Sequence, residues 1–212
     1  MNKVVQKAFE LIIVFVAIAG LILTLIGSGK TENSCQLATE ILRLLFYFTI
    51  DSSLFVLLLF FIRLLAGKRL FRITENPVLS GSITINILVT GIVFILLLRS
   101  FESKFGPILY AGNIMLHYLL PPLSLIYFMI YTKGKRLIYS DVLYWLIFPA
   151  FYFIITIIRG AITGKYPYPF IDAKTLGYPK VFLSSIFILI FIIFLGAVLI
   201  SINKLINKQL RR

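Results

Sequence analysis

Six long apolar blocks are the feature that most restricts the fold of this 212-residue chain. Each block is about 18–24 residues long, which is enough for an α-helix to cross a hydrocarbon core of about 30 Å. Inside a bilayer the backbone must form its hydrogen bonds within its own segment, so blocks of this length are expected to be helices. We therefore predict an all-α, polytopic integral membrane protein, a bundle of six transmembrane helices. The predicted spans are residues 9–26, 42–65, 80–98, 107–130, 141–158 and 181–200.

The composition also favours a membrane protein. Hydrophobic residues make up 60% of the chain, whereas soluble domains are about 45–50% apolar. A chain of this length has no aqueous core large enough to bury so much apolar surface. We expect one domain, residues 1–212, that consists of the six spans and their short connections.

The positive charges predict an orientation. The net charge is +13, but Lys and Arg lie at the ends of the apolar blocks. They form no basic groove with interleaved aromatic residues, so nucleic acid is not an expected partner. With the N-terminus in the cytoplasm, 13 of the 21 Lys and Arg residues fall on the inner side and 8 on the outer side. The positive-inside rule therefore predicts that both termini are cytoplasmic.

The second predicted span carries a cluster of hydroxyl groups. Burying polar groups in a bilayer costs free energy, so each is a candidate for function. At 100° per residue Thr49, Ser52 and Ser53 share one face of a helix. Ser and Thr also link membrane helices by hydrogen bonds or bond to their own backbone, which is the structural alternative for this face.

Asp51 lies on the same predicted span but points about 200° away from Thr49. An ionised carboxylate inside a membrane must find a partner or take up a proton. Tyr47, one turn earlier, and Asn86 on the third predicted span are the expected partners.

The fourth predicted span carries Asn113 and His117 one turn apart, and His117 is the only histidine in the chain. From the same side of the membrane, His117 is about 15 Å deep and Thr49 about 10 Å deep at 1.5 Å per residue. The two side chains are therefore expected to meet. Pro121 and Pro122 follow, and because proline has no N–H they predict a kink one turn beyond the histidine. A lone histidine cannot form a multi-histidine metal site, so no metal or other cofactor is expected.

The connection from Arg159 to Lys180 is the third unusual feature. Its Tyr166-Pro167-Tyr168-Pro169 segment alternates aromatic and proline residues, which predicts a stiff, extended chain. Aromatic side chains suit the membrane interface. The segment is either an interfacial anchor or a lid over a cavity that opens to the outside.

Three stretches of this sequence resemble the Pr6Pr family of bacterial six-helix membrane proteins, which belongs with the FAR-17a/AIG1-like (androgen-induced) proteins. They are residues 47–54 (YFTIDSSL), residues 117–121 (HYLLP) and a stretch from Pro149 through Ile158-Arg159-Gly160 to residues 166–172 (YPYPFID). The last is long and unusual in composition, whereas the link to the animal proteins depends mainly on Thr49 and His117.

The resemblance implies a hydrolase. The animal relatives cleave fatty acid esters of hydroxy fatty acids with an intramembrane threonine and histidine, roles that would fall on Thr49 as nucleophile and His117 as general base. Such a reaction needs no cofactor, and the expected partner is a membrane lipid or a lipid ester. The residues expected to bind substrate or support the pair are Asp51, Ser52, Ser53, Asn113, Arg159 and Tyr168. Either Asn113 or Ser53 would stabilise the oxyanion, and a bacterial cytoplasmic membrane is the expected location.

The sequence departs from the bacterial pattern within the second span. The family motif reads Thr-Ile-Gln-Ser-Asn, whereas Asp51 and Ser53 occupy the Gln and Asn positions here. A non-enzymatic alternative therefore stays open: a carrier of protons or small solutes, or a lipid-binding scaffold. In a carrier, Asp51 and His117 would be relay or ligand groups.

Overall fold

The computed structural model describes residues 3–29, 34–65, 67–132 and 136–209, and every regular element in these ranges is a helix. Six helical segments are long and apolar enough to cross a membrane, which confirms the prediction of an all-α integral membrane protein with six spans. These segments are Lys3–Ser28, Phe48–Leu65, Pro77–Lys104, Pro107–Tyr131, Asp141–Thr163 and Tyr178–Lys208.

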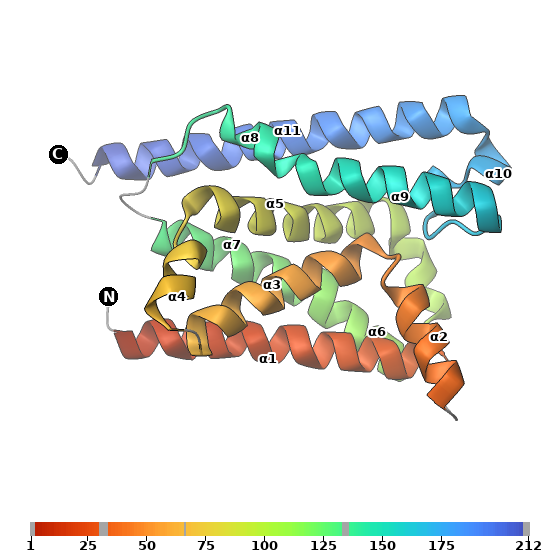
Figure 1. Cartoon of the computed structure of the whole chain (residues 1–212), viewed down its shortest axis with the longest axis horizontal. Coiled ribbons are helices and arrows are strands. Elements are labelled where there is room, and N and C mark those ends of the chain that lie inside the picture. Colours follow the sequence, from red (N-terminus) through yellow and green to blue (C-terminus); the bar gives the residue numbers. More distant parts are fainter. Residues whose placement is uncertain (1–2, 30–33, 66, 133–135, 210–212) are drawn as a thin grey trace. The chain divides into compact units, whose positions relative to one another are not determined.

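The chain divides into two compact units, residues 1–133 and residues 134–212. The first unit contains the first four spans and two short helices (Figure 1). Its α-helices are α1 (Lys3–Ser28), α2 (Ser34–Leu44), α3 (Phe48–Leu65), α4 (Lys68–Thr74), α5 (Pro77–Val93), α6 (Pro107–Asn113) and α7 (Leu120–Tyr131). Three further turns complete the third and fourth spans: the π-helices Phe94–Leu98 and Ile114–Leu119, and the 3₁₀ helix Arg99–Lys104.

The second span is shorter than predicted, because the predicted segment 42–65 falls on two helices. Helix α2 ends at Leu44 and α3 begins at Phe48, and Figure 1 shows α2 steeply inclined to α3. On α2 the residues Leu37, Ile41 and Leu44 lie on one side and polar residues on the other, a pattern typical of helices that lie at a membrane interface. The break places Thr49 in the first turn of α3.

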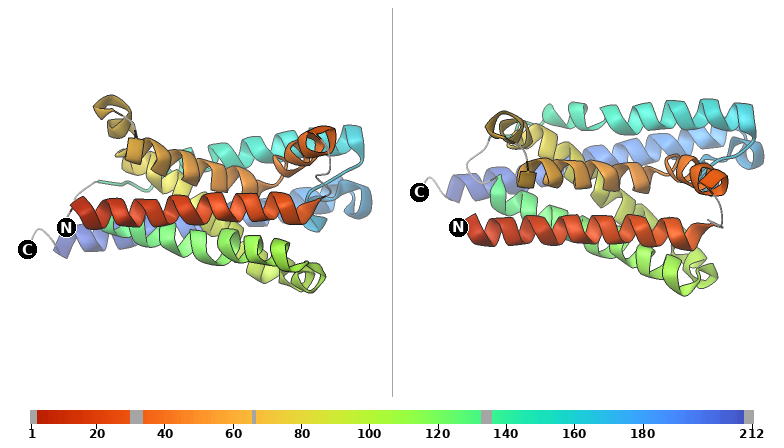
Figure 2. Two further views of the ribbon diagram at one scale, coloured as in Figure 1. Left: turned by 90° about the horizontal axis from the view of Figure 1, so that it is seen from below. Right: turned by 60° about the horizontal axis from the view of Figure 1, so that its bottom comes forward.

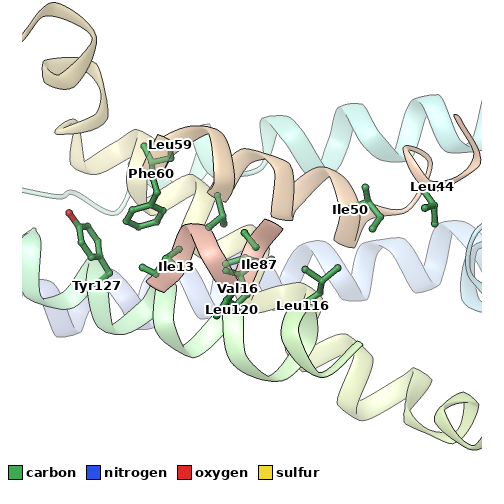
Figure 3. Close-up of a cluster of buried hydrophobic side chains, with 12 residues drawn as sticks. Ile13, Val16, Leu44, Ile50, Leu59, Phe60, Ile87, Leu116, Leu120 and Tyr127 are labelled. Atoms are coloured by element: carbon green, nitrogen blue, oxygen red, sulfur yellow. The ribbon is translucent and has the colours of Figure 1, made fainter. Parts of the chain in front are cut away.

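Helices α1 and α3 pack against each other, as do α1 and α6, α3 and α5, and α5 and α7. Their shared interior is a cluster of buried apolar side chains (Figure 3). The cluster comprises Ile13, Val16, Ala17, Leu44, Ile50, Val56, Leu59, Phe60, Ile87, Leu116, Leu120 and Tyr127. Apolar side chains such as Phe15 on α1 and Leu58 on α3 are exposed on the outside of the unit, where a lipid tail would contact them.

Two glycines let α1 and α6 approach closely. A Cβ on Gly27 would lie 2.5 Å from the Leu109 backbone nitrogen, and one on Gly112 would lie 2.7 Å from Thr24 Oγ1. Small residues at such contacts are characteristic of membrane helices, where van der Waals packing replaces the hydrophobic effect as the cause of association. Figure 2 shows the fourth span running obliquely along α1.

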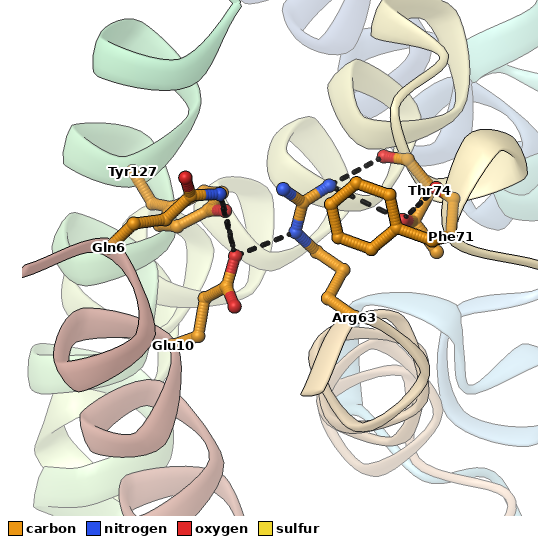
Figure 4. Close-up of polar contacts among 6 residues, drawn as sticks. All are labelled: Gln6, Glu10, Arg63, Phe71, Thr74 and Tyr127. Carbon is orange, nitrogen blue, oxygen red and sulfur yellow. Dashed lines mark hydrogen bonds and ion pairs between the residues drawn. The ribbon is translucent and has the colours of Figure 1, made fainter. Parts of the chain in front are cut away.

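A buried ion pair links α1 to α3. Arg63 Nε lies 2.9 Å from Glu10 Oε1, and the two side chains are 6% and 3% exposed. The same carboxylate oxygen accepts hydrogen bonds from Gln6 and from the Tyr127 hydroxyl of α7. Arg63 also donates to the Thr74 carbonyl of α4 at 3.2 Å (Figure 4). Neither Glu10 nor Arg63 was singled out by the sequence, yet this cluster joins four helices.

The second unit contains the fifth and sixth spans. Its elements are α8 (Asp141–Trp145), α9 (Ile147–Thr163), a 3₁₀ helix (Pro169–Ile171), α10 (Ala173–Leu176) and α11 (Tyr178–Gln209). The α8–α9 segment begins at Asp141 as predicted for its span and continues to Thr163, and α11 extends beyond the predicted 181–200 at both ends.

The Tyr/Pro segment of this unit is extended only in part. Tyr168 has an extended backbone, but the chain then turns through the 3₁₀ helix that starts at Pro169. The ring of Tyr166 packs against Gly160, where a Cβ would lie 2.0 Å from Tyr166 Cε1. Asp172 caps α10. Its carboxyl accepts hydrogen bonds from the Thr175 hydroxyl and from the backbone N–H groups of Lys174 and Thr175, and these bonds lower its pKa.

The buried ion pair predicts a large loss of stability in Arg63→Ala. Removal of one partner leaves the Glu10 carboxylate buried without its cation, which costs about 3–5 kcal/mol. The measurement is the free energy of unfolding in detergent, with the exposed Arg72→Ala as the matched control. The double variant Glu10→Leu/Arg63→Leu is expected to be more stable than Arg63→Ala, because it leaves no unpaired charge. Equal stability of Arg63→Ala and Arg72→Ala would contradict this role.

Candidate functional site

Thr49 and His117 are in direct contact. Thr49 Oγ1 lies 3.1 Å from His117 Nε2, although the two residues are 68 positions apart in the chain. Thr49 is 8% exposed and comes from the first turn of α3, whereas His117 comes from the π-helix of the fourth span. The contact predicted from the similar depth of the two residues is confirmed.

The second ring nitrogen of His117 determines which tautomer fits. Nδ1 lies 3.3 Å from the backbone carbonyl oxygen of Asn113. A carbonyl oxygen can only accept, so Nδ1 must carry the hydrogen and donate it. In the neutral ring Nε2 then has a free lone pair, and the Thr49 hydroxyl donates its hydrogen to Nε2. This is the arrangement that a general base requires.

Phe94 covers the imidazole. Its ring centroid lies 4.1 Å from that of His117 with 32° between the ring planes, and its side chain is 4% exposed. Phe94 also makes an edge contact with the Tyr118 ring, with 6.2 Å between centroids. The apolar ring therefore covers one face of the imidazole and restricts how it can tilt.

The turn that carries His117 is wider than an α-helix. The Leu120 N–H bonds to the Met115 carbonyl five residues earlier, which is the π-helical pattern and is often found at functional sites. The π-helix ends at Leu119, and Pro121 and Pro122 follow in the first turn of α7, where they remove two N–H groups from the ladder. Gly91 of α5 lies against this turn, and a Cβ there would be 2.8 Å from the His117 carbonyl oxygen.

The other polar residues of α3 have different surroundings. Ser53 donates to the Thr49 carbonyl at 2.7 Å. The Ser52 hydroxyl is fully buried and has no hydrogen-bond partner among the described residues. The prediction that Asp51 pairs with Asn86 is wrong, because no hydrogen bond joins the two side chains among the described residues. The Asn86 amide donates to the Ser82 carbonyl of its own helix at 2.8 Å.

Asn113 contributes its side chain as well as its carbonyl. Its Nδ2 donates to Glu102 Oε1 at 2.8 Å, and the Tyr118 hydroxyl donates to the same oxygen at 2.9 Å. Glu102 lies on the 3₁₀ helix at the end of the third span. Glu102 was not predicted from the sequence, because it follows the predicted span 80–98. It does lie on the same side of the membrane as the start of the fourth span, and this position could have pointed to it.

Arg159 and Tyr168 belong to the second unit. The Arg159 carbonyl accepts a hydrogen bond from Thr163 at 2.8 Å, and the Tyr168 ring stacks on Phe170 with 5.2 Å between centroids. Within the first unit the structure brings together Thr49, His117 and Asn113, and Ser53 bonds to the Thr49 backbone. In the described ranges no three His, Cys, Asp or Glu side chains are grouped as metal ligands would be.

Comparisons of the chain with protein-family models, with curated proteins and with solved structures found no match. The fold and the contacts define an integral membrane protein in which a buried threonine and a histidine from two different spans form a hydroxyl–imidazole pair.

The close approach of α5 predicts that Gly91→Ala disturbs the site. The added Cβ would lie 2.8 Å from the His117 carbonyl oxygen and 2.9 Å from Pro121 Cγ, and overpacking of this kind costs about 1–3 kcal/mol. The measurement is thermal unfolding in detergent. Gly106→Ala is the control, since nothing lies within 4 Å of its Cβ position. An unfolding temperature for Gly91→Ala equal to that of Gly106→Ala would show that the helices are not this close.

Proposed function

We propose that this protein is an intramembrane threonine hydrolase that cleaves lipid esters, such as fatty acid esters of hydroxy fatty acids. Thr49 is the nucleophile and His117 the general base. The observation that carries the proposal is the 3.1 Å contact between Thr49 Oγ1 and His117 Nε2. A hydroxyl group is a weak nucleophile until a base within hydrogen-bond distance takes its proton. The resemblance of residues 47–54 and 117–121 to the Pr6Pr and FAR-17a/AIG1-like proteins supports the same assignment.

In the proposed reaction the Thr49 oxygen forms a bond to the ester carbonyl carbon while its proton passes to His117 Nε2. The tetrahedral intermediate then expels the alcohol, which takes that proton, and the acyl group remains on Thr49. Water attacks the acyl group as Nε2 accepts one of its protons. The fatty acid leaves, and Thr49 regains its hydrogen from the imidazolium.

Ser52 is the oxyanion donor that we assign. Of the two donors expected from the sequence, Ser53 donates its only hydroxyl hydrogen to the Thr49 carbonyl, and Asn113 donates one of its two Nδ2 hydrogens to Glu102. The Ser52 hydroxyl is buried and has no partner in the described part of the chain. It lies three residues after Thr49, a spacing that puts two Cβ atoms about 5–6 Å apart on a helix. The N-terminus of α3 adds a positive partial charge near the developing oxyanion.

The test is hydrolysis by purified protein in proteoliposomes. Thr49→Ala and His117→Ala are each expected to lower the rate by about 100- to 10,000-fold, and Ser52→Ala to lower kcat by about 100- to 1,000-fold. A fluorophosphonate probe should label the wild type and Ser52→Ala but not Thr49→Ala. Thr39→Ala, which removes an exposed hydroxyl, is the control. Full activity in a folded Thr49→Ala variant would exclude the mechanism.

A second candidate function is favoured by Asp51, whose half-buried carboxylate has no hydrogen bond or ion pair among the described residues. In a proton or small-solute carrier this group would bind the cargo. Two results together would favour the carrier over the hydrolase. The wild type would hydrolyse no ester, and its proteoliposomes would show a pH-dependent flux that Asp51→Asn abolishes.

We further propose a bacterial cytoplasmic membrane as the location, with both termini in the cytoplasm. Cys35, the only cysteine of the chain, tests the orientation because it is exposed on α2, after the first span. A membrane-impermeant maleimide is expected to label it in intact spheroplasts. Cys35→Ser is the control for background labelling. Labelling only after lysis would place the termini on the opposite side.

A further inference from the structure

Glu102 holds the fourth span at two points. Its Oε1 accepts hydrogen bonds from Asn113 Nδ2 at 2.8 Å and from the Tyr118 hydroxyl at 2.9 Å. The two donors lie on either side of His117 in the sequence, and their acceptor comes from the third span. Hydrogen bonds to an ionised carboxylate are about twice as strong as those between neutral groups.

The turn between these two donors is weakly held by its own backbone. It is π-helical, with the Leu120 N–H bonded to the Met115 carbonyl, and it is followed by Pro121 and Pro122, which supply no N–H to the carbonyls before them. A segment that lacks part of its ladder needs other contacts to keep one geometry. Glu102 supplies two such contacts.

The effect of Glu102 reaches the imidazole through Asn113. The Asn113 carbonyl accepts the Nδ1 hydrogen of His117 at 3.3 Å, while its side chain is bonded to Glu102. In a serine hydrolase triad a carboxylate accepts the Nδ1 hydrogen itself and thereby sets the tautomer. Here a backbone carbonyl accepts it, and the carboxylate fixes the residue that bears this carbonyl.

Arg99 leaves the Glu102 charge largely available for these contacts. Arg99 Nε lies 3.9 Å from Glu102 Oε2, and its side chain is 69% exposed, whereas that of Glu102 is 16% exposed. Ion pairs with so exposed a partner contribute little.

We propose that Glu102 is a positioning residue that fixes Asn113 and Tyr118 and thereby holds His117 as the Nδ1–H tautomer, with Nε2 facing Thr49. The consequence for catalysis depends on the proposed hydrolase function, whereas the effect on the tautomer does not. Glu102 contacts neither the imidazole nor Thr49 in the hydrogen bonds that define the site, so it acts through Asn113 and Tyr118.

The test uses the fact that His117 is the only histidine. In protein labelled with ¹⁵N-histidine, one pair of ring-nitrogen resonances reports this residue. The wild type is expected to show a protonated Nδ1 and an unprotonated Nε2. Glu102→Ala is expected to give averaged resonances of mixed tautomers. Glu102→Gln keeps an acceptor oxygen for both donors and is expected to restore the wild-type pattern. Arg99→Ala is the matched control and should leave the spectrum unchanged.

An unchanged spectrum in folded Glu102→Ala would overturn the proposal. Where Glu102→Ala does not fold, Tyr118→Phe carries the test, since it removes one of the two hydrogen bonds: a changed His117 spectrum supports the proposal and an unchanged one overturns it. If the ester is hydrolysed, Glu102→Ala should lower kcat by about 100-fold with little change in KM. An inactive wild type with a tautomer shift in Glu102→Ala would reject the hydrolase and keep the positioning role.

Discussion

A polar group inside a bilayer has no water to bond to, and this constraint organises the polar side chains of the first four spans. Several hydroxyl groups satisfy it locally: Ser53, Thr90 and Ser124 each donate to a carbonyl three or four residues earlier. The Thr49 hydroxyl also bonds across to another span, at His117 Nε2. The residues three and four before it lie in the break between α2 and α3, outside any helix. The break therefore places Thr49 at the start of α3, where its hydroxyl meets the histidine of the fourth span.

Helix α3 separates two polar clusters with different chemistry. Thr49 and Arg63 lie 14 residues apart on it, which is about 21 Å along a helix. At the Arg63 end, both charged groups are paired with each other and with neutral donors and acceptors from α1, α4 and α7. Such a cluster fixes how the helices pack. At the Thr49 end, the hydroxyl faces His117 Nε2, and the Ser52 hydroxyl has no partner in the ranges that the structure describes. Among the described residues, a buried hydroxyl without a partner is therefore found three residues after the candidate nucleophile.

The sequence predicted the parts of this structure that depend on length and depth. The lengths of the apolar blocks were enough to predict the six spans. The similar depth of Thr49 and His117 was enough to predict their contact. It could not predict the break at residues 45–47, since no proline or glycine marks it. Side-chain hydrogen-bond partners could not be predicted either. Asn86, for example, bonds to the Ser82 carbonyl of its own helix. The rotation of a helix about its axis decides which acceptor a side chain meets, and the sequence does not give this rotation. Glu102 lies outside the predicted span 80–98. Glu10 was not considered because the positive-inside rule uses only Lys and Arg.

The position of the imidazole is set by neighbouring helices more than by its own. In a regular helix the His117 carbonyl would be bonded four residues later, and in a π-helix five residues later, but both of those residues are prolines. What fixes the ring is the Asn113 carbonyl on Nδ1, the Phe94 ring on one face, and the close packing of Gly91 against its backbone. Two of these three contacts come from the third span. Because of the double proline, the position of the imidazole depends more on the third span than on the helix that carries the histidine. The geometry of the Thr49–His117 pair is therefore sensitive to changes in a span that contributes neither residue.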